Sequence, residues 1–106
     1  MGGVIRNDFL MRLIQQLAET IGRALGLAKK GQTEEAQKLL DEALRTHVGM
    51  PYSMLEKLPP EEIARLLGPE KCMIIAAILD ARAEVDRAPE LAVRAAAIRQ
   101  AAGLPQ

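Results

Sequence analysis

Aromatic side chains are almost absent from this sequence, which contains one Phe, one Tyr and no Trp. Nevertheless, 49% of its residues are hydrophobic, so a core has to be built mainly from Leu, Ile, Ala and Met. These residues favour helices, whereas strands are enriched in aromatic and β-branched side chains. A chain of 106 residues corresponds to about one domain with one core. The composition therefore predicts a single all-α domain.

Cysteine and long apolar runs are also scarce. Cys72 is the only cysteine, so no disulfide can form within the chain, and its apolar neighbours favour an inert buried thiol. The longest uninterrupted apolar run covers residues 72–79, which is far too short to span a bilayer. Arg6, Asn7 and Asp8 interrupt the N-terminal region, so it lacks the apolar segment of a secretory signal. We therefore expect a cytoplasmic protein without membrane contact.

Excess charge of one sign is missing as well. The 14 basic and 14 acidic residues cancel and are interspersed, so the basic patch typical of a nucleic-acid binder is absent. No Gly-rich phosphate loop occurs, and the acidic residues at 34–35 and 61–62 stand where helices are expected to start. With one His and one Cys, a metal site would need carboxylates as its other ligands. The sequence predicts no cofactor, no metal and no nucleic-acid partner.

A turn around Gly31 separates two amphipathic segments. Lys29 and Lys30 precede it, where cations complement the negative end of a helix dipole, and Gly31 can adopt the left-handed conformation that often ends a helix. Thr33 is expected to be the N-cap of the next helix, with Glu34 and the following Glu in its first turn. Because the first helix ends and the second starts within about four residues, the two should form an antiparallel hairpin.

The other glycines and prolines divide the remaining chain. Residues 1–6 look like a loose lead-in, and the first hairpin is expected over residues 8–48. Short helical turns should connect residues 49–68, because Pro51 and Pro60 suit first helical positions and Gly68-Pro69 suits a helix end. A second hairpin is expected over 69–103, with its turn at Ala88-Pro89. All three parts belong to one predicted helical domain, 1–106.

The first predicted helix is apolar over about half of its circumference, which is more than one neighbouring helix can cover. Its apolar residues are Phe9, Leu10, Leu13, Ile14, Leu17, Ala18, Ile21, Ala24, Leu25, Leu27 and Ala28. Either the connector covers the excess, or a second copy of the chain does so through a two-fold interface. We favour the dimer. Met11, Met50, Met54 and Met73 are adaptable side chains that suit such a surface.

The region around the turn resembles the tetratricopeptide repeat, a helix-turn-helix unit with small and large apolar residues at fixed positions. The matching residues are Ala24, Leu27, Gly31, Ala36, Leu40 and Ala43. The match is partial: Thr20 and Arg23 occupy the usual Trp and Leu positions, Leu27 replaces an aromatic residue, and Val48 replaces a Pro. The resemblance implies stacked helical hairpins, and the small residues would let two helices approach closely.

A second resemblance extends over nearly the whole chain. The segment 6–12, together with Ile14 and Leu17, residues 31–43 and residues 55–67, is similar to a family of small bacterial tetratricopeptide-like proteins of unknown function. That family implies no catalytic residues. The resemblance therefore supports the expected fold and leaves the activity open.

These observations favour a non-enzymatic protein-protein interaction module that forms a homodimer. The expected interaction surface consists of Phe9, Leu10, Leu13, Leu17 and Met73. The alternative is a small ligand-binding protein or enzyme with a pocket between the hairpins near His47 and Cys72, where the imidazole could serve as the base for a thiol nucleophile. A DNA-binding dimer is a third, weaker alternative.

Overall fold

The computed structural model describes the backbone of residues 2–105 and the side chains of residues 8–105. Within that part of the chain all regular structure is helical, which confirms the predicted all-α class. The helices are α1 (Gly2–Lys29), α2 (Thr33–His47), α3 (Tyr52–Leu55), α4 (Pro60–Val85) and α5 (Pro89–Ala101).

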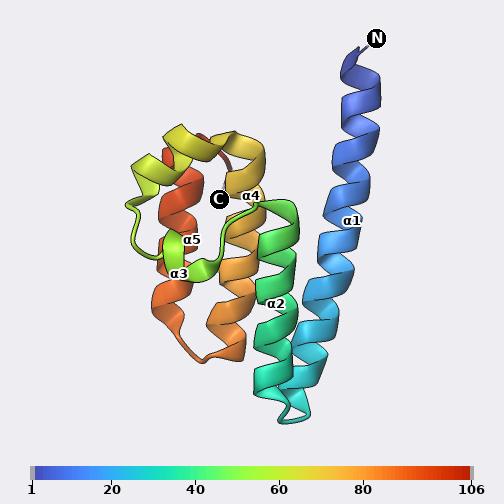
Figure 1. Cartoon of the computed structure of the whole chain (residues 1–106), viewed down its shortest axis with the longest axis vertical. Coiled ribbons are helices and arrows are strands. Elements are labelled where there is room, and N and C mark those ends of the chain that lie inside the picture. Colours follow the sequence, from blue (N-terminus) through green and yellow to red (C-terminus); the bar gives the residue numbers. More distant parts are fainter. Residues whose placement is uncertain (1, 106) are drawn as a thin grey trace.

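Helix α4 is the centre of the arrangement, because it packs against α1, α2 and α5. Figure 1 shows α2 beside the C-terminal half of α1, with α4 and then α5 following on the other side of α2. The first turns of α4 lie across one end of α4 and α5, and the short α3 lies beside α5 about midway along it. The apolar run at 72–79 is therefore enclosed by neighbours, as its lack of a polar face predicts.

The helix boundaries depart from the prediction at the N-terminus and follow it at Gly68. Helix α1 begins at Gly2, so the loose lead-in expected for residues 1–6 is wrong for residues 2–6, and Met1 lies outside the described residues. Gly68 has φ 83° and ψ 171°, a conformation that is not helical and is essentially restricted to glycine. The element α4 is thus two helical segments that meet at a sharp bend, which Figure 1 shows clearly.

The turn at Gly31 has the predicted conformation, with φ 82°. The N–H of Gln32 donates to the carbonyl of Leu27 at 2.9 Å, and the N–H of Gly31 donates to that of Ala28 at 3.0 Å. This pair of bonds is a Schellman motif, which satisfies the last carbonyls of α1. The predicted N-cap is wrong by one residue: Gln32 precedes α2 without a side-chain cap, and Thr33 is already helical.

The core consists of apolar side chains, and among residues 8–105 no polar or charged residue is buried. Helix α4 supplies nine of the buried residues. They are Ile63, Cys72, Ile74, Ile75, Ala76, Ile78, Leu79, Ala81 and Val85. A search of the described residues found no helix whose length and apolar character would suffice to cross a membrane.

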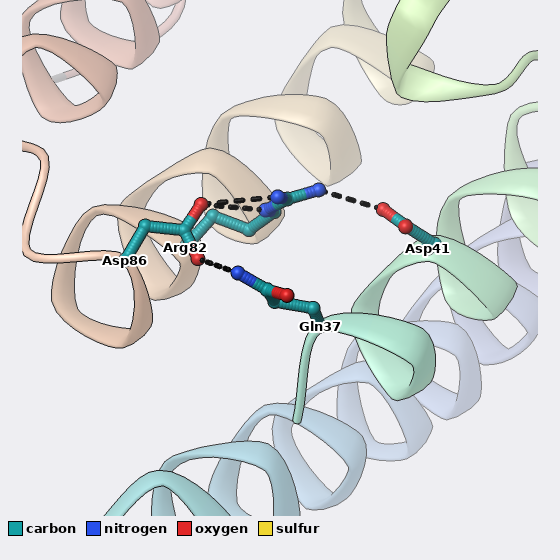
Figure 2. A network of polar contacts seen from close by, with 4 residues as sticks. All are labelled: Gln37, Asp41, Arg82 and Asp86. Carbon is teal, nitrogen blue, oxygen red and sulfur yellow. Dashed lines mark hydrogen bonds and ion pairs between the residues drawn. The ribbon is translucent and has the colours of Figure 1, made fainter. Parts of the chain in front are cut away.

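A polar network at the edge of this core holds the two hairpins together (Figure 2). The guanidinium of Arg82 on α4 donates to Asp41 of α2 at 2.8 Å and to Asp86 at 3.0 and 3.1 Å. Gln37 of α2 donates to the other oxygen of Asp86 at 2.7 Å. The same guanidinium lies 5.0 Å from the ring centroid of Tyr52, within cation–π distance. One arginine therefore links α2, α3 and the C-terminal end of α4.

Candidate interaction surface

The N-terminal half of α1 extends past the end of α2, whereas its C-terminal half lies against α2 (Figure 1). Phe9, Met11 and Ile14 in this part of α1 are 68%, 60% and 44% exposed. They are three of the six large hydrophobic side chains that are exposed in the described part of the chain, and they fall within six consecutive residues. Exposed apolar groups concentrated in this way are typical of an interaction site.

Two adjacent apolar faces run along α1. The first contains Leu10, Leu13, Leu17 and Ala24 and points toward the core, since Leu17 is 6% exposed and Ala24 fully buried. The second is shifted by one residue, or about 100° around the helix. Its members Met11, Ile14 and Ala18 are exposed, while Ile21 and Leu25 further along are partly buried. We call Met11, Ile14 and Ala18 the exposed strip.

The structure distributes the predicted surface residues over different environments. Phe9 is exposed, but it lies on roughly the opposite side of α1 from Ala18. Leu10 is half-buried, Leu13 packs against the core, and Leu17 is a core residue that does not reach the surface. Met73 is half-buried on α4. The predicted set therefore marks mainly the covered face of α1.

Sequence reasoning placed too much weight on the leucines and missed the exposed strip. The sequence does contain a pattern that marks this strip, because residues 11, 14, 18, 21 and 25 are apolar and are separated alternately by three and four positions. The leucines at 10, 13 and 17 follow the same spacing one position earlier, and only the packing shows which of the two faces is covered. Because Met11 and Ile14 remain exposed, the connector does not cover the excess apolar surface of α1.

The alternative site near His47 and Cys72 does not coincide with the cleft at the Gly31 turn. That cleft has a volume of about 600 Å³ and is lined by the ends of α1 and α4 and the start of α2. His47 lies at the other end of α2, and Cys72 is fully buried. The cleft presents Lys29 and Arg87 beside Glu84 and Asp86, so it favours neither sign of ligand charge. Within the described residues, no three His, Cys, Asp or Glu side chains are grouped as metal ligands.

Burial makes the Cys72 thiol a poor nucleophile. The loss of solvent around the side chain raises its pKa above the ordinary value, so the thiol stays protonated at neutral pH. We expect no measurable alkylation of Cys72 by iodoacetamide until denaturant unfolds the protein. The variant Ser53→Cys, which places a thiol at an exposed position, serves as the reactive control. Alkylation of folded wild-type protein at the rate of that control would contradict this prediction.

The same shift gives a direction for the pH dependence of stability. Because the pKa of Cys72 is raised in the folded state, the unfolded chain loses this proton at a lower pH than the folded chain does. The free energy of unfolding should therefore fall as the pH rises above 9.0, the ordinary pKa of this group. Cys72→Ala should reduce that fall. Tyr52 contributes in the same direction at higher pH, since its pKa is raised by desolvation and by the nearby charge of Glu56.

No family model matches the chain, and the searches of curated proteins and of solved structures gave no match. The likeness to the tetratricopeptide repeat therefore depends on the residues around the first hairpin. Ala24, Ala36 and Leu40 have no exposed surface, and Ala43 is also buried. These are the positions at which the repeat pattern requires close packing of its two helices.

Proposed function

We propose that the chain is a non-enzymatic protein-protein interaction module that self-associates as a homodimer through the N-terminal half of α1. The observation that supports this proposal is the exposure of Met11 and Ile14 on a face of α1 that none of the other described helices covers. A second copy is a suitable partner because a two-fold interface lets one strip bury its counterpart. The polar network around Arg82 and the leucine face of α1 then serve as the rigid support.

The tetratricopeptide-like character of the hairpins supports this proposal. Repeat units of this kind cannot bury all their apolar surface alone and are stable when stacked on further units. Here α1 and α5 are the edge helices, and α1 has the larger exposed side chains. We propose that the second copy takes the place of the next unit beside α1, in a cytoplasmic protein similar to small bacterial tetratricopeptide-like proteins.

The size of the exposed strip sets the expected affinity. Complete burial of one Met, Ile or Phe side chain contributes about 1.5 to 3 kcal/mol, and an interface of this kind buries only part of each. A dissociation constant of about 1 µM corresponds to about 8 kcal/mol, after the cost of association has been met. Two copies of a small strip should therefore associate in the micromolar range or more weakly.

Sedimentation velocity over a concentration series tests the proposal. We expect the wild type to change from monomer to dimer between about 1 and 500 µM. A dissociation constant at the upper end of this range corresponds to a binding free energy of about 4.5 kcal/mol. Ile14→Glu should be monomeric over this range, because it places a charge in the interface, and its melting temperature at low concentration should be unchanged. Leu13→Glu is less suitable because Leu13 packs against the core.

Val93→Glu is the matched control, since Val93 is the most exposed large hydrophobic residue among residues 8–105 and lies on α5. This variant should dimerise like the wild type. A wild type that remains monomeric at the highest concentration contradicts the proposal, as does an Ile14→Glu variant that dimerises with unchanged affinity.

A further inference from the structure

Four exposed charges on α1 form no ion pair with any other residue whose side chain the structure describes. Between residues 8 and 28, α1 carries only Asp8, Arg12, Glu19 and Arg23 as charged residues. All four are exposed, and none of them forms an ion pair with another described residue, although two acid-base pairs have the i, i+4 spacing. In contrast, Arg65, Arg82 and Arg99 all bind carboxylates within the chain.

These charges alternate in sign, and their spacing is symmetric about the middle of the segment. The midpoint lies between Gln15 and Gln16. Asp8 lies as many residues before this midpoint as Arg23 lies after it. The same relation holds for Arg12 and Glu19. If the segment is reversed end to end about this midpoint, each acid therefore coincides with a base.

We propose that two copies of α1 pair antiparallel, with a two-fold axis near Gln15 and Gln16, and that these four charges set the orientation and register. This inference rests on the homodimer proposed above. Asp8 then lies opposite the partner's Arg23, and Arg12 lies opposite the partner's Glu19, so that the two-fold axis generates four ion pairs. Residues 8–23 overlap over about 24 Å of helix.

The position of the charges around the helix favours the same orientation. At about 100° per residue, all four fall within an arc of about 60° on one side of the exposed strip. In an antiparallel helix pair, the corresponding sides of the two helices face each other, whereas in a parallel two-fold pair each side meets the opposite one. A parallel pair in register would place the charges of the two copies on opposite sides of the interface, with like charges at the same level, so that none of them meets its complement. Only the antiparallel pair brings all four charges to opposite charges.

The sizes of the apolar side chains also fit this register. Met11 lies at the level of residue 20 of the partner copy, between the partner's Ala18 and the partner's Gly22, where two small residues leave room for a long side chain. Gly22 is otherwise unexplained, because a Cβ added there would meet no atom within 4 Å and a helical glycine costs about 1 kcal/mol relative to alanine. In the proposed pair, Gly22 allows the close approach of Met11 from the other copy.

Charge reversal tests the register. Arg12→Glu should raise the dissociation constant about tenfold or more, because it turns two of the four ion pairs into repulsive contacts. The double variant Arg12→Glu/Glu19→Arg should restore an affinity close to that of the wild type. Circular dichroism of each variant checks that the helices are intact, and higher salt should weaken the wild-type dimer.

Cysteine cross-linking tests the orientation, and buried Cys72 does not interfere. In the proposed pair, two copies of Gln15→Cys are offset by about 1.5 Å along the helix axis, whereas two copies of Gly26→Cys are about 30 Å apart. We therefore expect Gln15→Cys to form a disulfide dimer on mild oxidation and Gly26→Cys to remain uncross-linked. A parallel pair would place the two copies of residue 15 on opposite sides of the interface, too far apart for a disulfide, so Gln15→Cys would stay uncross-linked.

The possible outcomes separate this inference from the proposed function. A wild type that dimerises while Gln15→Cys fails to cross-link, while Gly26→Cys cross-links, or while the double charge variant fails to recover affinity, overturns the antiparallel register and leaves the homodimer intact. A monomeric wild type overturns the homodimer itself. Recovery by the double variant together with selective cross-linking of Gln15→Cys supports both.

Discussion

Replacing Ile75 with alanine should lower the free energy of unfolding by about 3 kcal/mol, within the range for removing a large buried side chain. Ile75 is 1% exposed and belongs to α4, the helix that packs against α1, α2 and α5. The loss combines the transfer free energy of the missing carbons with the cavity that remains, because the surrounding helices cannot all close on the gap. For a domain of this size the melting temperature should drop by more than about 10 °C.

Urea denaturation followed by circular dichroism measures this effect, at a protein concentration low enough to keep the chain monomeric. Val93→Ala on α5 is the matched control, since it also shortens an apolar side chain but at an exposed position. That variant should change the free energy of unfolding by less than about 0.5 kcal/mol. Equal losses in the two variants would contradict the central position of α4.

Replacing Arg82 with alanine should cost about 2 kcal/mol, which is the second large effect. The side chain is 14% exposed and joins Asp41 on α2 to Asp86 at the end of α4. Its removal leaves Asp86, at 18% exposure, with only the amide of Gln37 as a donor in this network. A partly buried carboxylate that loses its cationic partner is costly, whereas the more exposed Asp41 is compensated by water.

Arg65→Ala provides the control for this prediction. Arg65 also forms an ion pair, with Glu62 at 2.5 Å, but its side chain is 70% exposed. Solvent screens such a pair, so its loss should change the free energy of unfolding by less than about 0.5 kcal/mol. The same denaturation experiment measures both variants. Similar effects at Arg65 and Arg82 would mean that the network in Figure 2 does not stabilise the contact between the hairpins.

The candidate surface shows where sequence reasoning reaches its limit. The breadth of the apolar face of α1 predicted that part of it would be left over, and the exposure of Met11 and Ile14 agrees with that expectation. The choice of residues was less successful, because Leu17 is in the core and Leu13 packs against it. Both faces of α1 repeat with helical spacing, so periodicity alone gives no way to rank them. Which one is covered depends on how α2 and α4 approach the helix.

Local chemistry determined the secondary structure of this chain. Gly31, Gly68 and the prolines that start α4 and α5 act through backbone dihedral angles and lost N–H groups, which depend on neighbouring residues alone. The lack of polar side chains in residues 72–79 likewise identified the most enclosed helix, because burial of an apolar side chain is favourable whatever covers it.

Only the tertiary structure decided which apolar face of α1 is covered and how Arg82 joins the two hairpins. The participants in the Arg82 network are up to 49 residues apart, as with Gln37 and Asp86, so no local spacing relates them. Similarly, Leu10 and Met11 are adjacent and both apolar, and their different environments follow from the direction in which α1 leaves α2. That direction is set by the packing of α4 against both helices, a property of the assembled core.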